Sequence, residues 1–203
     1  RSQILCFSFP LRRLAAVLIV VNMAFASVRP PQSAQHSAAY RSMEQKLAYL
    51  RENAAKPYPD RHPTELTQAE VNAYFNEGGV KLPKGVTHLQ LTAMPAVVDG
   101  TAKVDFDAIT AAKRSSNPLL SLFRGMHDVR VVAQAAGIHG MASVRVQSVY
   151  LDGVEVPQIA LEFFVERYIT PKYPNVGLNS TFKVPLRVDT AIVHAGAVSI
   201  MQK

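Results

Sequence analysis

The segment Pro157–Ile169 constrains the fold of this chain more than any other, because it reads as a helix with two apolar rows. Proline fits the first helical turn, and Pro171 ends the helix soon after its last apolar residue. Helical spacing gives one apolar stripe: Leu161, Phe164, Val165, Tyr168 and Ile169. Ile159 and Phe163 form a second row beside it. Two rows need cover from more than one surface, so we expect a sheet that curls around this helix.

The segments on both sides of this helix alternate apolar and polar residues, as antiparallel strands with one buried face do. The expected strands are residues 86–93, 102–108, 129–135, 144–151, 154–156, 182–188 and 198–200. Asp99-Gly100 and Asp152-Gly153 are expected hairpin turns. A slip in the alternation at Ser148 predicts a bulge, and Pro185 favours an edge strand.

Three further segments are predicted to be helical. Apolar residues recur every three to four positions from Tyr40 to Ala54, and Pro57 and Pro59 end that helix. A capping box, Thr67–Glu70, begins a second helix, and the short apolar segment Asn117–Phe123 suits a third. The predicted fold is therefore α+β: an antiparallel sheet of about six strands curled around an amphipathic helix, with an N-terminal helical arm.

The first 26 residues have the features of a secretory signal peptide. Three arginines precede or adjoin an apolar run, Leu14–Val21: Arg1, Arg12 and Arg13. Ala24-Phe25-Ala26 is a small-x-small cleavage site, so we expect cleavage after Ala26 and a periplasmic or secreted protein. The alternative is a retained anchor, although the run is shorter than the roughly 20 residues that span a bilayer.

Removing residues 1–26 leaves 19 basic and 15 acidic residues, a net charge of +4 rather than +7. This small, scattered charge argues against a nucleic-acid partner, but it is compatible with contact with an anionic membrane surface. Cys6, the only cysteine, lies in the expected signal peptide, so the mature chain would have neither disulfide nor thiol. We divide the chain into residues 1–26, a lead-in and helical arm (27–62) and a main domain (63–203), and we expect the arm to be dispensable for folding.

No catalytic or metal-binding motif stands out. The six histidines lack metal-ligand spacing, so we expect no metal: His36, His62, His88, His127, His139 and His194. Asp105 and Asp107 share a face of their expected strand, but a solvated edge explains them better than paired-carboxylate chemistry. With no G-x-S-x-G and no phosphate loop, we expect neither an enzyme nor a cofactor.

The order of elements from Leu66 to Lys203 resembles small bacterial periplasmic proteins related to tubular lipid-binding domains. The likeness lies in Leu66-Thr67, in the Leu-Pro step within 82–86, and in 104–107. A hairpin over Val149–Pro157 that leads into an amphipathic helix completes it. The resemblance implies a sheet wrapped around a helix, with lipid tails held in the groove between them. It assigns no individual residue as a lipid ligand.

The second apolar row of Pro157–Ile169 exceeds what one sheet contact requires, which predicts a hydrophobic groove. The expected lining residues are Ile159, Leu161, Phe163, Phe164, Leu120 and Phe123. A filled core has the same composition as an apolar pocket, so plain core is the alternative interpretation of these residues. The leading hypothesis is an exported, non-enzymatic protein that binds lipid or another hydrophobic small molecule. An envelope scaffold whose protein partner the sequence does not identify is the runner-up, and a hydrolase of unknown type is a third reading.

Overall fold

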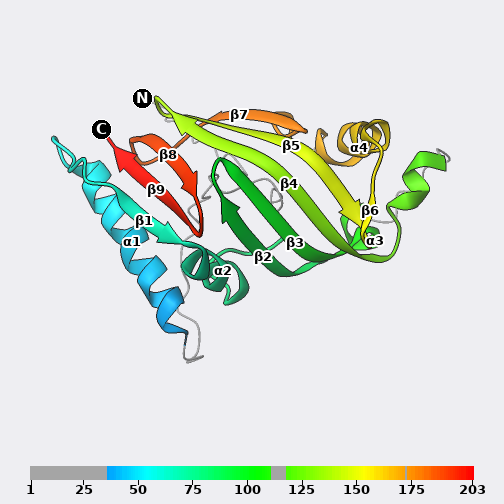
Figure 1. Ribbon diagram of the computed structural model, residues 1–203, viewed down its shortest axis with the longest axis horizontal. Helices are drawn as coiled ribbons and strands as arrows, with labels where there is room; N and C mark the ends of the chain where they lie inside the picture. The colour runs from blue at the N-terminus through cyan, green and yellow to red at the C-terminus, as the bar shows by residue number, and fades with distance from the viewer. Residues whose placement is uncertain (1–35, 111–117, 172) are drawn as a thin grey trace, which may run out of the picture.

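The computed structural model describes residues 36–110, 118–171 and 173–203, which form an α+β molecule with one open antiparallel sheet (Figure 1). The expected signal peptide and most of the lead-in lie outside the described residues, as does Asn117. The helices are α1 (Ala38–Ala55), α2 (Gln68–Asn76), α3 (Phe106–Thr110), the 3-10 helix η1 (Pro118–Leu122), α4 (Gln158–Phe164) and the π-helical turn η2 (Val165–Ile169).

The strands are β1 (Thr64–Thr67), β2 (Val86–Met94), β3 (Val97–Asp105), β4 (Met126–Ile138), β5 (Met141–Leu151), β6 (Val154–Glu155), β7 (Asn179–Lys183), β8 (Val188–His194) and β9 (Ala197–Gln202). The described residues thus contain nine strands, where the sequence predicted about six. The α+β class and the antiparallel pairing are confirmed.

The long hairpin β4–β5 is the centre of the sheet. Strands β3 and then β2 lie beside β4, whereas β6 and β7 lie beside β5 (Figure 1). The far end of β4 pairs instead with β8, where Gly137 lies opposite Ala191, and β9 and β1 follow. A Cβ on Gly137 would lie 2.8 Å from the Cβ of Ala191, so glycine permits this close approach.

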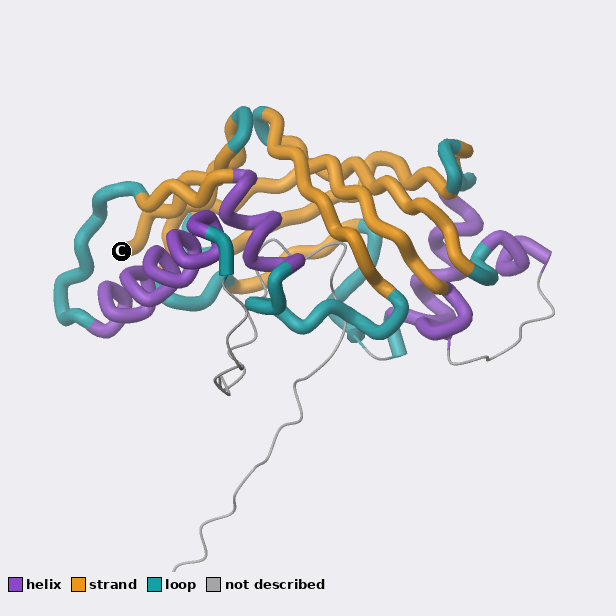
Figure 2. The backbone as a smooth tube through the Cα atoms, turned by 90° about the horizontal axis from the view of Figure 1, so that it is seen from below, coloured by secondary structure: helices purple, strands orange, loops and turns teal. Residues whose placement is uncertain are grey.

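The helices lie on one face of the sheet, the inner face, in two groups at its two ends (Figure 2). The first group, α1 and α2, packs near β1, β2 and β9, and the second contains α3, η1 and α4. The main apolar core lies on this face and joins strand residues such as Leu91, Val104 and Val131 to Phe164 of α4. The sheet therefore has an apolar inner face and a mostly polar outer face.

The arm helix α1 packs against the rest of the molecule. Its buried stripe has the spacing expected from the sequence: Tyr40, Met43, Leu47 and Leu50. Met43, Leu47 and Leu50 form a cluster with Leu66 of β1. The boundary between residues 62 and 63 stays a prediction, as does the dispensability of 27–62, but these contacts favour the opposite outcome for a truncation.

The predicted turn at Asp99-Gly100 is wrong. The chain turns at Pro95–Ala96, and Asp99 and Gly100 lie within β3, opposite Thr92 and Leu91. Arg130 of β4 binds the Asp99 carboxylate, with Nη2 2.6 Å from Oδ2, which fits Asp99 on the outer face of a strand. Gly100 leaves room for the Leu91 side chain, because a Cβ added at Gly100 would lie only 3.1 Å from Leu91 Cδ2.

Two other strand predictions fail at their ends. The strand expected to reach Ala108 stops at Asp105, because Asp105 Oδ1 accepts the N–H groups of Asp107 (3.0 Å) and Ala108 (3.2 Å) and so caps α3. The strand expected over 182–188 is interrupted after Lys183. Pro185 lies in a turn rather than in an edge strand, and Leu186 and Arg187 follow it with positive φ.

Other local predictions are confirmed. The register between β4 and β5 shifts between Val132 and Ala133, next to the slip expected at Ser148. Asp152-Gly153 is a turn, and Thr67 and Glu70 form the capping box of α2. The helix after Pro157 is continuous through Ile169, as α4 followed by η2.

Candidate ligand-binding surface

An aromatic cluster holds the second group of helices under the sheet. The ring of Phe164 stacks on that of Phe123, with centroids 4.3 Å apart. Phe106 meets both rings edge-on, at 5.4 Å from Phe123 and 5.5 Å from Phe164. Tyr168 extends the cluster, 5.3 Å from Phe164. All four side chains are buried, so α4 and η1 are fixed to the inner face by apolar contact.

The predicted groove residues fall into two sets. Four of them are buried together in the main core: Leu120, Phe123, Leu161 and Phe164. The other two, Ile159 and Phe163, are 55% and 39% exposed on the side of α4 that faces away from the core. Successive residues turn by about 100° around a helix axis, so the second row does not share the covered side. The row that suggested a groove therefore does not face the sheet.

Apolar residues that the two helix groups leave partly exposed offer a different candidate surface. We define the inner apolar surface by the partly buried residues Phe75, Leu82, Ile109, Ala135, Val146, Ile169 and Leu178, which pack against the main core. Val146 and Leu178 are neighbours, since the Val146 N–H donates to the Leu178 carbonyl at 2.8 Å. These residues come from both helix groups, the loops between elements and the sheet, and each of them packs against the main core.

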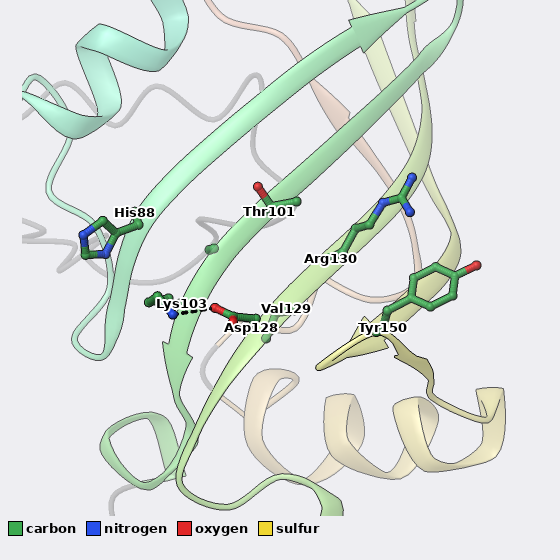
Figure 3. Close-up of a pocket in the computed structure, with 9 residues that line it drawn as sticks. His88, Thr101, Lys103, Asp128, Val129, Arg130 and Tyr150 are labelled. Carbon is green, nitrogen blue, oxygen red and sulfur yellow. Dashed lines mark hydrogen bonds and ion pairs between the residues drawn. The ribbon is translucent and has the colours of Figure 1, made fainter.

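The outer face of the sheet carries a shallow hollow of about 450 Å³ (Figure 3). Its charged groups are paired across strands: Lys103 Nζ lies 2.9 Å from Asp128 Oδ1, and Arg130 binds Asp99. The Arg130 guanidinium also lies 5.7 Å from the ring centroid of Tyr150. The hydrogen bonds that Lys103 and Arg130 donate to Asp128 and Asp99 raise the pKa of both cations. Because these cations are already neutralised, the hollow is poorly suited to binding an anion. Its ion pairs instead hold neighbouring strands together.

One histidine–carboxylate pair was not anticipated from the sequence. His127 Nδ1 lies 2.6 Å from Asp152 Oδ2, and His127 Nε2 lies 2.7 Å from the Arg124 carbonyl. The hydrogen bond to Asp152 raises the pKa of His127 above its usual value, although partial burial opposes this shift. Both ring nitrogens are occupied in this way, so the pair fastens the β5–β6 turn to the start of β4. The partners are 25 positions apart, and no motif marks them.

The described residues contain neither a paired-carboxylate site nor a metal site. Asp105 is engaged in capping α3, so Asp105 and Asp107 do not form a carboxylate pair facing a substrate. Within residues 36–110, 118–171 and 173–203, no three histidine, cysteine or acidic side chains gather as a metal site would require. In the same part of the chain, none of the helices combines the length and apolar character needed to cross a membrane.

Comparison with known protein families, with curated proteins and with solved structures finds no match to this chain. The resemblance to tubular lipid-binding proteins therefore stays a prediction.

Proposed function

We propose that the protein is exported and binds lipid or another hydrophobic molecule at its inner apolar surface, without catalysing a reaction. The observation that carries this proposal is the partial exposure of apolar side chains that pack against the main core, among them the neighbours Val146 and Leu178. Burial of partly exposed apolar groups by an apolar ligand is favourable, because it removes them from water. The signal-peptide features of residues 1–26 support a periplasmic or secreted location.

Two variants test the location of the ligand. Leu178→Asp places a carboxylate on the inner apolar surface, where an acyl chain would leave it without hydrogen-bond partners. We expect it to abolish the uptake of a fluorescent fatty acid. Ile159→Asp makes the same change on the exposed side of α4 and serves as the matched control, with uptake unchanged. Equal uptake by both variants and the native protein would contradict this location.

A third variant separates loss of binding from loss of folding. Ala135→Phe fills part of the inner apolar surface with an apolar group, so it reduces the space for a ligand without burying a charge. We expect weaker uptake at an unchanged circular dichroism spectrum. Mass spectrometry of a solvent extract of the purified protein would identify any lipid bound in the cell. Native protein that takes up no apolar probe and yields no lipid would overturn the proposal.

A scaffold function is the second candidate, and exposed apolar side chains at the α4 end favour it. Ile159 and Phe163 are exposed on α4, and Val154 of β6 is 71% exposed. Exposed apolar groups of this kind commonly contact a protein partner. Site-specific photo-crosslinking from position 163 in cells tests this candidate. A discrete crosslinked protein, lost in the Ile159→Asp variant, would support it.

A further inference from the structure

The edge of the sheet formed by β2 is covered by side chains of α2. Three amide residues spaced four positions apart face this edge: Gln68, Asn72 and Asn76. Asn72 acts as a strand residue would, because its Nδ2 donates to the Leu91 carbonyl (2.9 Å) and its Oδ1 accepts the Leu91 N–H (2.7 Å). Gln68 Oε1 accepts the Ala93 N–H at 3.0 Å, and Asn76 Nδ2 donates to the Leu89 carbonyl at 2.6 Å. The amides satisfy donors and acceptors that an edge strand otherwise exposes.

The edge formed by β1 is also covered. Lys46 of α1 donates from Nζ to the Glu65 carbonyl at 2.6 Å. The Thr67 N–H donates to Glu70 Oε2 at 2.7 Å, as part of the capping box. The N–H of Gln68 donates to the Gly196 carbonyl in the β8–β9 turn. Because backbone groups alternate in direction along a strand, the Glu65 carbonyl and the Thr67 N–H point away from β9. Side chains therefore occupy outward-facing backbone groups on two of the sheet's edges.

The edge formed by β7 lacks such cover within the described parts of the chain. The Leu178 carbonyl accepts from Val146, and the Val184 N–H donates to Gly140, so even-numbered residues bond toward β5. Successive residues direct their backbone groups to opposite sides of a strand. The groups that point outward therefore belong to Asn179, Thr181 and Lys183, which are all exposed. Among the described residues, β7 pairs with β5 alone (Figure 1).

The side chains along this edge differ between its two faces. On the outer face, Lys183 and Arg145 are exposed, and neither has an ion-pair partner among the described residues. On the inner face, Phe182 is partly buried, next to Leu178 at the start of the strand. A strand added beside β7 would place alternate side chains on these two faces. One set would meet two cations, and the other would meet apolar groups.

We propose that the outer edge of β7 docks an extended peptide segment of a partner protein, whose residues alternate between acidic and apolar. The backbone groups of Asn179, Thr181 and Lys183 supply the hydrogen bonds, and the two faces select the side chains. Charge argues for such a partner rather than for a second copy of this chain. Pairing of β7 with its own copy would bring the Lys183 and Arg145 side chains of both copies to one surface.

The test uses the full chain and a fluorescein-labelled peptide of about seven alternating glutamate and valine residues, a length that spans one short edge strand. We expect a rise in fluorescence anisotropy and slower exchange of the Asn179, Thr181 and Lys183 amide protons. Thr181→Pro removes one outward N–H but leaves the ladder to β5 intact, so it should weaken binding about three- to tenfold. Thr181→Val is the matched control and should bind like the native protein.

Charge reversal tests the side-chain preference. An alternating lysine and valine peptide should bind the native chain weakly, and Lys183→Glu should shift the preference toward it. Failure of the glutamate peptide to protect the β7 amides would overturn the proposal, as would equal binding of both peptides by the native chain. Displacement of the peptide by a fatty acid would also contradict it, because the peptide would then occupy the inner apolar surface. Concentration-dependent dimerisation that protects the same amides would assign the edge to a second copy instead.

Discussion

The helix groups at the two ends of the sheet differ in the share of polar contacts that hold them. At the α1–α2 end, polar side chains join elements that are distant in sequence. Glu70 accepts from Ser42 Oγ at 2.5 Å and from Lys46 Nζ at 2.7–2.8 Å, which ties α1 to α2. At the α4 end, the rings around Phe164 provide the contacts described above. The α1–α2 end therefore adds hydrogen bonds of fixed geometry to its apolar contacts, whereas the contacts of the α4 end are mainly apolar.

Buried amides strengthen the polar end. Asn53 is 1% exposed and donates from Nδ2 to the Asp60 carbonyl (2.7 Å) and to Gln202 Oε1 (2.8 Å). Gln202 Nε2 donates in turn to the Leu50 and Leu186 carbonyls, at 2.8 Å and 2.6 Å. A buried amide with its partners in place is tolerated, whereas one that loses a partner is costly. The polar end should therefore respond sharply to removal of a partner, and the apolar end to removal of volume.

The largest effect is expected from deletion of residues 27–62. This deletion removes α1, and with it the buried side chains that contact β1 and Gln202. Loss of one such apolar side chain costs about 2–5 kcal/mol, so the sum approaches the roughly 5–15 kcal/mol stability of a whole domain. We expect urea unfolding, followed by circular dichroism, to lose its cooperative transition.

Deletion of residues 27–35 is the control, since it leaves every described contact of α1 in place. A cooperative transition of unchanged midpoint after the longer deletion would show that the arm is dispensable, as the sequence alone suggested.

A smaller effect is expected from Phe164→Ala at the apolar end. Phe164 is buried among three other rings, so its truncation should cost about 3–5 kcal/mol through lost contact and a residual cavity. Phe163→Ala, one position away on the exposed side, should cost only about 1 kcal/mol. The urea unfolding midpoints of the two variants, compared at a constant m-value, measure both losses of stability. Equal losses for the two variants would mean that Phe163 is covered in solution.

The smallest effect is expected from the charge of Glu70. Burial raises the pKa of this carboxyl, but hydrogen bonds from Lys46, Ser42 and Thr67 outweigh burial and lower the pKa from 4.5 to about 2. The charged form thus stabilises the fold above pH 4.5, and this contribution is lost as the pH falls toward 2. Glu70→Gln should cost on the order of 2 kcal/mol at neutral pH and flatten the stability profile between these pH values.

The matched control for this charge is Glu52→Gln, at an exposed position of α1. It should leave the profile unchanged when urea unfolding is repeated from pH 2 to 7. A native profile that stays flat below pH 4.5 would contradict the role of Glu70.

The difference between the two ends also explains which parts of the fold the sequence could predict. Local patterns determine the stripe of α1, the capping box of α2 and the helix after Pro157, so their prediction succeeded. Asp99-Gly100 has the composition of a turn but lies in β3, where Asp99 binds Arg130, 31 positions away. No local pattern marks such a partner. At the break after Lys183, the Leu186 carbonyl likewise accepts a hydrogen bond from a distant residue, Gln202.

The candidate site was predicted in part for the same reason. Helical spacing correctly grouped Leu161 with Phe164, and both lie in the core with Leu120 and Phe123. Spacing alone does not say which side of a helix the rest of the molecule covers, so Ile159 and Phe163 were assigned to the groove. The residues that define the inner apolar surface were not singled out, because Phe75, Val146 and Leu178 come from separate elements and no local pattern groups them.

The hydrogen bond between Asn53 and Gln202 spans 149 positions of sequence and has a consequence for the order of folding. The ribosome makes α1 long before it makes β9, so the helix must wait for nearly the whole chain before its buried amide meets this partner. Contacts of such long range form late and slowly. During that interval Leu66 of β1 can already cover part of the apolar stripe of α1, whereas the Asn53 amide still lacks its Gln202 partner. Completion of β9 is therefore the step that satisfies the buried amide of α1.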